Sequence, residues 1–206
     1  DWKFSDFSNI ISKKFKNINI NFEENKKLKF NNYIKDFEHN KIVFLNGLYD
    51  SHSFKHENEE KIHFDNLRKG PGYEAKGKNS LKLLNNAFFI DGLLLYVKKG
   101  YECNKPLIIY NVINTQSNNN FFNQKILINV EENSKLDLII YSVNLNSEPV
   151  FLNTSNFFLV EKYGMLKLFN INELNNDDIN YNFNQINVNE NGIFENFVLS
   201  CYSAFF

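Results

Sequence analysis

The stretch that decides the fold is VEENSKLDL at residues 130–138. It recurs as VEKYGMLKL at residues 160–168 and, in a more divergent form, as VNENGIFEN at residues 188–196. In each copy one apolar strand ends, the chain turns through polar residues that include Ser or Gly, and a second strand begins. The copies are about 30 and about 28 residues apart, a spacing typical of solenoids. The repeat therefore predicts stacked coils, an architecture that acts first of all as a scaffold.

From residue 90 onward, apolar residues occupy every second position on both sides of each turn. This period of two is typical of a strand that turns one face toward a core. The Asn, Gly and Ser residues in the turns tolerate a left-handed backbone at low cost. Together these features favour a β-helix over a β-sandwich. The clearest alternating positions are Ile126, Ile128, Val130, Leu136, Leu138, Ile140, Phe158, Val160, Leu166, Leu168, Ile186 and Val188.

The first 89 residues lack this period and predict a small mixed α/β region. Residues 42–46, IVFLN, followed by Gly47, are typical of a strand that enters a tight turn. Residues 50–79 are polar and charged and contain Gly-Pro-Gly at 70–72, which indicates a linker or surface loop. Ser80 is expected to cap a short amphipathic helix over residues 80–89. The expected apolar face of that helix consists of Leu81, Leu84, Ala87 and Phe88, and Phe4, Phe7, Ile10, Ile11 and Phe15 have a similar, weaker spacing.

The composition argues against several classes of function. The chain has 206 residues and a net charge of −1, and Arg68 is its single arginine. Nucleic-acid binding normally needs a basic, arginine-rich face, so it is not expected here. No apolar run reaches the roughly 18–20 residues of a membrane span. Because the chain opens on Asp1-Trp2-Lys3 without a signal-peptide core, we expect a cytoplasmic protein and an excerpt of a longer one.

One segment superficially resembles a metal site. Residues 56–63, HENEEKIH, contain two His and three Glu, which are residue types that bind zinc or iron. The His-Glu-x-x-His spacing of a helical site is missing, and the segment lies in the most hydrophilic part of the chain. A solvated charged loop is the preferred interpretation, and any metal ligand stays unknown. The residues concerned are His56, Glu57, Glu59, Glu60 and His63.

A second segment, KGKNS at residues 76–80, resembles a phosphate-binding loop only in part. Such a loop needs Gly-x-x-x-x-Gly-Lys-Ser/Thr after a strand, so that backbone N–H groups surround the phosphates. Here Gly72 lies one residue too far away, and Asn79 stands where the hydroxyl is required. Nucleotide binding is therefore not expected, and the nucleophile motif Gly-x-Ser-x-Gly is missing from the sequence as well.

The two cysteines are too few for a disulfide framework or a cysteine-based zinc site. Cys103 lies in an expected turn between strands, where nearby Lys residues could make it reactive, although an incidental turn thiol is preferred. Cys201 lies in the apolar stretch 198–202 and is expected to be a small core residue rather than a sulfur acceptor.

Several motifs resemble the SufD family of the SUF iron–sulfur cluster assembly system. DWKFS at residues 1–5 is similar to the family's early Glu-x-Trp-Lys-Tyr-Thr motif, and IVFLNG at residues 42–47 to its Leu-Val-Phe-Val-Asp/Asn-Gly strand. Most specific is LNNAFFIDG at residues 84–92, followed by VKKG and KPL. It resembles the signature Leu-Asn-x-Ala-Phe-x-x-Asp-Gly, then Val-Pro-Lys-Gly and Lys-Pro-Ile, with Lys98 in place of the first Pro. Residues 127–142 resemble the next coil, and the Trp-Lys-Phe opening favours SufD over its paralogue SufB.

The resemblance implies a right-handed parallel β-helix. Residues 1–89 would form the mixed region and residues 90–206 the first coils, ending before the family's C-terminal helical region. It also implies a scaffold rather than an enzyme, which pairs with SufB through the β-helices and binds the ATPase SufC through that C-terminal region. The Fe–S cluster would form transiently on the whole complex, with no cofactor intrinsic to this segment. Since the family's Cys/His positions lie beyond residue 206, no catalytic or cofactor-binding residue is carried over.

Two alternatives remain open at this point. A carbohydrate-active β-helix enzyme would usually gather Asp, Arg and Lys on one exposed strand face, and a single arginine counts against it. A plain structural interaction solenoid without an Fe–S role differs from a SufD-like protein only through the family resemblance.

Overall fold

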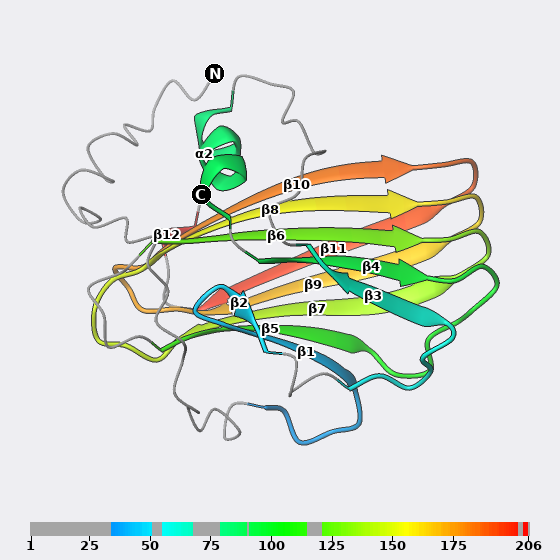
Figure 1. Ribbon diagram of the computed structural model, residues 1–206, viewed down its shortest axis with the longest axis horizontal. Coiled ribbons are helices and arrows are strands. Elements are labelled where there is room, and N and C mark those ends of the chain that lie inside the picture. Colours follow the sequence, from blue (N-terminus) through cyan, green and yellow to red (C-terminus); the bar gives the residue numbers. More distant parts are fainter. Residues whose placement is uncertain are drawn as a thin grey trace.

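The computed structural model describes residues 34–50, 55–67, 79–89, 91–114, 121–201 and 204–205. Two six-stranded sheets lie face to face (Figure 1). Sheet A has the strand order β11-β9-β7-β5-β1-β2, and sheet B has the order β12-β10-β8-β6-β4-β3. The elements are β1 Asn40–Leu45, β2 Leu48–Tyr49, β3 Ile62–Asn66, α2 Ser80–Phe88, β4 Gly92–Val97, β5 Leu107–Ile113, β6 Phe121–Val130, β7 Lys135–Asn144, β8 Phe151–Val160, β9 Met165–Glu173, β10 Ile179–Val188, β11 Ile193–Cys201 and β12 Ala204–Phe205.

Each coil contains one strand from each sheet, so that β6 is followed by β7 and the chain then returns to β8 beside β6. The pairing between successive coils is parallel and without a register shift. Val130 lies opposite Val160, which lies opposite Val188, and Leu138 lies opposite Leu168. The expected β-solenoid is thus confirmed, with the sequence repeat as the length of one coil. Its right-handed sense stays a prediction.

Tight turns join sheet B to sheet A along one side of the solenoid, which we call the turn edge. The third residue of each turn has a left-handed backbone, with φ of 73° at Gly100, 57° at Asn133, 58° at Tyr163 and 55° at Asn191. Successive turns are stacked by backbone hydrogen bonds, such as the 3.1 Å bond from the Asn133 N–H to the Lys162 carbonyl. The opposite side, with the connections 145–150 and 174–178, is the loop edge.

The interior between the sheets has two halves. Beside the turn edge it is apolar, and Leu136, Leu138, Leu166 and Leu168 are at most 1% exposed in one continuous cluster. Beside the loop edge it is lined by amide and hydroxyl side chains that bond across the sheets and between coils. The buried members of this amide half are Asn111, Gln124, Ser142, Thr154, Asn156, Asn170, Asn172 and Asn180.

The first end of the solenoid is closed by strands that run against the parallel order. β2 pairs antiparallel with β1, and β3 pairs antiparallel with β4. Tyr49 of β2 and Phe64 of β3 pack on the core with ring centroids 4.8 Å apart. The strand expected over residues 42–46 is β1, with the turn at Asn46 and Gly47 where it was predicted.

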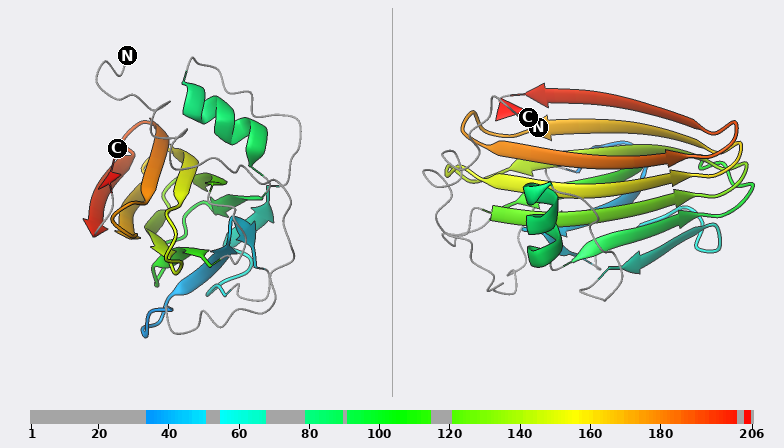
Figure 2. Two further views of the ribbon diagram at one scale, coloured as in Figure 1. Left: turned by 90° about the vertical axis from the view of Figure 1, so that its left-hand side faces the viewer. Right: turned by 90° about the horizontal axis from the view of Figure 1, so that it is seen from above.

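The helix α2 lies outside the solenoid, on the outer face of sheet B (Figure 2). Its N-cap is Asn79, whose side chain accepts a hydrogen bond from the Lys82 N–H, and not Ser80 as predicted. Leu81 is buried as expected, but Ala87 is exposed and Asn85 takes a buried position instead. Among the described residues, no helix is long and apolar enough to cross a membrane.

The charged segment 50–79 differs from the expected loop, because residues 62–66 form β3. Alternation of Ile62 and Phe64 with polar residues carries the signal for this strand, but the surrounding charges obscured it. The predictions on residues 4–15 and on the Gly-Pro-Gly stretch at 70–72 lie outside the described residues.

Candidate functional site

The acidic segment before β3 contains a structural anchor. The Glu57 carboxylate accepts hydrogen bonds from the Tyr101 hydroxyl at 2.6 Å and from the N–H groups of Asn104 and Lys105 at 2.8 and 2.9 Å. Burial alone would raise the pKa of this carboxyl, but these bonds lower it below its usual value. Glu57 is therefore a latch between two loops, not the solvated charge that the sequence suggested.

The two histidines of this segment do not come together as a metal site. His56 Nε2 lies 3.9 Å from Glu59, whereas His63 is on β3 with its Nε2 3.5 Å from Asp65. Within the described part of the chain, no group of three or more His, Cys, Asp or Glu side chains is placed to hold a metal ion.

Cys103 is not an activated thiol. It packs against the apolar interior, and its N–H donates to the Lys135 carbonyl at 3.0 Å. Burial, with smaller contributions from Glu57 and Asp137, raises the pKa of the thiol to about 12. Since the thiolate is the reactive form, Cys103 fits a packing role.

The helix start at Asn79 and Ser80 has no phosphate-binding geometry to offer in its described part, because Asn79 caps its own helix. Residues 76–78 lie outside the described residues. Beneath the same helix, Lys125 donates a hydrogen bond to Asn86 and lies 4.2 Å above the Phe89 ring. Burial, reinforced by nearby Lys82, lowers the pKa of Lys125 to about 8. Its observed contacts hold the helix to sheet B.

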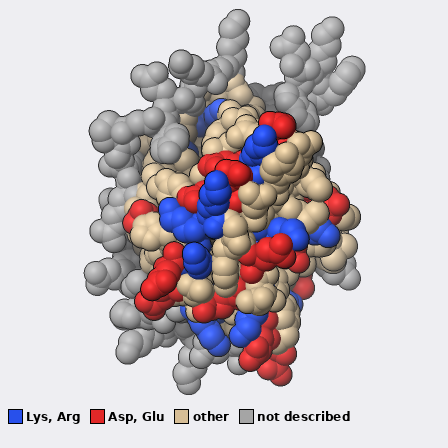
Figure 3. All heavy atoms as spheres, turned by 90° about the vertical axis from the view of Figure 1, so that its right-hand side faces the viewer, with Lys and Arg blue, Asp and Glu red and all other residues tan. Residues whose placement is uncertain are grey.

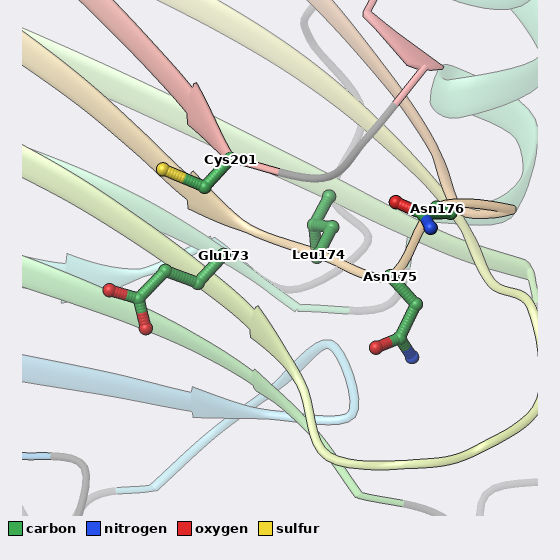
Figure 4. Close-up of a pocket in the computed structure, with 5 residues that line it drawn as sticks. All are labelled: Glu173, Leu174, Asn175, Asn176 and Cys201. Atoms are coloured by element: carbon green, nitrogen blue, oxygen red, sulfur yellow. The ribbon is translucent and has the colours of Figure 1, made fainter.

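The most open concave feature lies at the loop edge, next to the last coil. It is a hollow of about 490 Å³ lined by Glu173, Leu174, Asn175, Asn176 and Cys201 (Figure 4). Glu173 and Cys201 are opposite one another on β9 and β11, and their side chains extend in the same direction. Cys201 was expected to be a small core residue, but it is partly exposed at the edge of sheet A.

A chain of polar contacts leads from this hollow across the outer face of sheet A. The Tyr141 hydroxyl donates to Glu173 and accepts from Lys35 Nζ at 3.3 Å. The Lys35 N–H donates to the Tyr110 hydroxyl at 3.1 Å, which also contacts His39 Nε2 at 3.0 Å. Burial lowers the pKa of His39 and raises that of Tyr110, which favours the neutral form of both.

The side chains at the hollow set a limit on its chemistry. One thiol, one carboxylate and two amides fall short of the four thiolates that usually hold an iron–sulfur cluster. The sequence analysis missed Glu173, although the repeat contains the signal. Counting one coil on from Glu173 gives Cys201, so an alignment of the repeats alone would have placed them side by side.

The turn edge presents charges of both signs in rows (Figure 3). The second residue of each turn alternates in sign along the solenoid, from Lys99 through Glu132 and Lys162 to Glu190. Lys99 Nζ lies 2.6 Å from Glu132, and Lys162 Nζ lies 2.9 Å from Glu190. A surface of paired charges does not attract a polyanion, in agreement with the expectation that nucleic acid is not a partner.

No protein-family model matches this chain, and no curated protein matches it significantly.

Proposed function

We propose that this protein is a SufD-like scaffold subunit of the SUF iron–sulfur cluster assembly complex. It would assist iron acquisition and cluster assembly together with SufB and the ATPase SufC, in the cytoplasm and without catalysis of its own. The observation that carries the proposal is where the SufD-like signature, residues 84–92, lies in the fold. It spans the junction at which α2 leads into β4, the first strand of the solenoid proper.

Each polar or glycine position of the signature has a definite task at this junction. Asn85 is fully buried and donates to the carbonyls of Gln124 and Asn153, at 2.9 and 2.7 Å, which ties the helix to two strands. The Asp91 carboxylate accepts from the Tyr49 N–H at 3.2 Å. A Cβ at Gly92 would lie 2.6 Å from the Lys125 carbonyl, so only glycine fits. The motif is thus one that a solenoid of this construction needs in this order, which supports a family relationship.

The scaffold role agrees with what the described residues offer. Their most regular surfaces are rigid rows on parallel strands, and the hollow at the loop edge has one thiol and one carboxylate. In the proposed role the Fe–S cluster is cargo, formed on the whole complex, and this chain contributes a surface for SufB.

A plain interaction solenoid is the second candidate. It is favoured by the self-paired charges of the turn edge, which serve the stack itself. A carbohydrate-active enzyme is less well supported, because the row Asp137, Lys167 and Glu195 on sheet A alternates in sign, and Lys167 lies 3.5 Å from Glu195.

Capture of SufB tests the proposal. The tagged 206-residue chain is mixed with SufB and, separately, with SufC from the same organism, and complexes are resolved by size-exclusion chromatography. We expect SufB to be retained, and the chain alone to show neither ATP hydrolysis nor a stable Fe–S spectrum after reconstitution. Failure to retain SufB at low salt would overturn the SufD assignment and leave the plain interaction solenoid.

Two variants show which surface SufB uses. Lys99→Glu with Lys162→Glu alters the turn edge, whereas Ile186→Lys with Val198→Lys alters the end formed by β10 and β11. An unrelated β-rich protein serves as the control for nonspecific capture. Retention of that control protein to the same extent would also count against SufD.

A further inference from the structure

The end of the solenoid at β10 and β11 is an interior that lacks its next layer. Val130 and Val160 are fully buried, yet Val188, the next residue in the same column, is 44% exposed. Ile186 ends its column in the same way and is 38% exposed. These are core positions of the repeat, and their exposure arises because no coil covers them among the described residues.

The backbone of this end is also ready for pairing. β11 is the outermost strand of sheet A, and β10 pairs with β12 only at Ile179 and Asn180. β12 runs parallel to β10, so this edge already accepts a strand in the direction of the repeat. Unpaired strand edges bind further strands through their free N–H and C=O groups.

The charges of the turn edge define the partner. The row from Lys99 to Glu190 alternates in sign and ends on an acid. A second row, Asp137, Lys167 and Glu195, alternates in the same manner and also ends on an acid. A basic residue opposite Glu190 and another opposite Glu195 would continue both rows.

We propose that this end binds a strand–turn–strand segment of a second, different polypeptide. The segment runs parallel to β10 and β11, covers Ile186, Val188 and Val198, and carries one lysine opposite Glu190 and one opposite Glu195. This rests on the scaffold part of the proposed function and not on its Fe–S role.

A second copy of this chain fits the same end less well. With the turn edges of two copies aligned, Glu190 and Glu195 would approach the same acidic residues of the copy. With one copy reversed, Ile186 and Val188 would lie against the amides of Asn182 and Asn184. The other end of a copy is closed by β2 and β3.

The chain itself supplies a probe for the test. A peptide with the sequence of residues 156–169, NFFLVEKYGMLKLF, carries its lysines at the two required positions, since Lys162 and Lys167 contact Glu190 and Glu195 within the fold. An uncharged solubilising tail and a fluorophore allow anisotropy titration against the full 206-residue chain. The matched control peptide has both lysines replaced by Glu.

We expect the lysine peptide to bind about tenfold more tightly than the control at low salt, because two exposed ion pairs distinguish them. The difference should shrink at about 0.5 M salt, where exposed charges are screened. The double variant Glu190→Lys with Glu195→Lys should reverse the preference, whereas Glu102→Lys, a similar charge change in the first coil, should leave it unchanged. Circular dichroism checks that both variants fold.

Equal affinity of the chain for both peptides would overturn the proposal, as would an unchanged preference in the double variant. A stable dimer that excludes both peptides would assign the surface to a second copy and overturn it too. Capture of SufB is a separate readout, so failure of peptide binding with SufB retained refutes this inference alone.

Discussion

The two edges of the solenoid solve the same problem, joining one sheet to the other, by different means. At the turn edge each connection is a short turn of the same backbone shape, and successive turns bond to one another through their backbones. At the loop edge the connections are held by side chains. Asp178 is the centre of one of them, accepting from the Val150 N–H at 2.8 Å and the Asn175 N–H at 2.6 Å.

The difference teaches where the coil register is set. A repeated backbone shape with apolar residues behind it fixes the stack at the turn edge, whatever the exposed side chains are. The loop edge depends on individual polar residues, so each of its contacts can be lost separately. Four substitutions or conditions break or sharpen this comparison, and they follow from the largest expected effect to the smallest.

Leu138→Asp should have the largest effect, because it places a charge in the apolar half of the interior. Leu138 is 0% exposed and stacks on Leu107 and Leu168. A buried carboxylate without a cation nearby should lower the free energy of unfolding by about 4 kcal/mol or more. Urea denaturation measures this, with Asp137→Asn on the exposed side of the same strand as control. Normal stability of Leu138→Asp would contradict the assigned strand register.

Asp178→Asn should have an intermediate effect that stays local to the loop edge. Asp178 is fully buried, and an amide cannot accept at both oxygens as the carboxylate does. The loss of one buried hydrogen bond should cost about 2 kcal/mol. Hydrogen exchange should show faster exchange at Val150 and Asn175 but no change at Asn133 and Tyr163. Equal acceleration at both edges would mean that the edges are not separate.

Tyr163→Asn should stabilise the protein slightly. Tyr163 has φ of 58°, a left-handed conformation that asparagine adopts more readily, as at Asn133 and Asn191. Its side chain is about half exposed, so little packing is lost. We expect a gain of about 0.5–1 kcal/mol in the free energy of unfolding. The reverse change, Asn133→Tyr, should lose a similar amount, and a loss in both variants would show that the tyrosine ring matters more than its backbone.

The two edges should respond to pH with opposite sign. At the turn edge, burial acts to raise the pKa of Glu131, but the Lys99 N–H and the Lys98 ammonium lower it overall. Its contribution is therefore present above the ordinary pKa of 4.5 and lost as pH falls through the lowered value. At the loop edge, burial raises the pKa of Asp178 above 3.8, so its contribution is present below 3.8 and lost as pH rises through the raised value.

Urea denaturation of matched variants measures these small contributions. Between about pH 7 and about pH 3, the stability difference between the wild type and Glu131→Gln should shrink, whereas the difference between the wild type and Asp178→Asn should grow. Parallel changes in both pairs would show that the edges titrate alike.

The turn edge could be predicted from the sequence because its physics is periodic. VEENSKLDL and its copies set the strand ends, the turns and the interior leucines at once, and Leu136 and Leu166 stack as expected. The amide half of the interior could not be predicted, because Asn is abundant throughout this chain and a buried Asn has the same letter as an exposed one. Asn170 and Asn182, for example, bond across the sheets.

The candidate site was predictable only in part. Sequence reasoning correctly rejected a metal cluster at residues 56–63 within the described part of the chain. It missed the latch at Glu57, since contacts to Tyr101 and Lys105 join segments far apart in sequence. Glu173 escaped notice because a single carboxylate has no motif, and only the coil register places it beside Cys201.

The stacked turns also decide where this protein can be labelled. An extra residue in any turn of the turn edge would displace the left-handed position and interrupt backbone bonds to the turns on either side. The connection 145–150 has no such constraint in register, because it spans the sheets through side chains such as Asn144 and Asp178. A fluorophore or epitope placed near Ser147 would therefore report on the assembled protein, whereas the same insertion beside Asn133 would report on a disrupted stack.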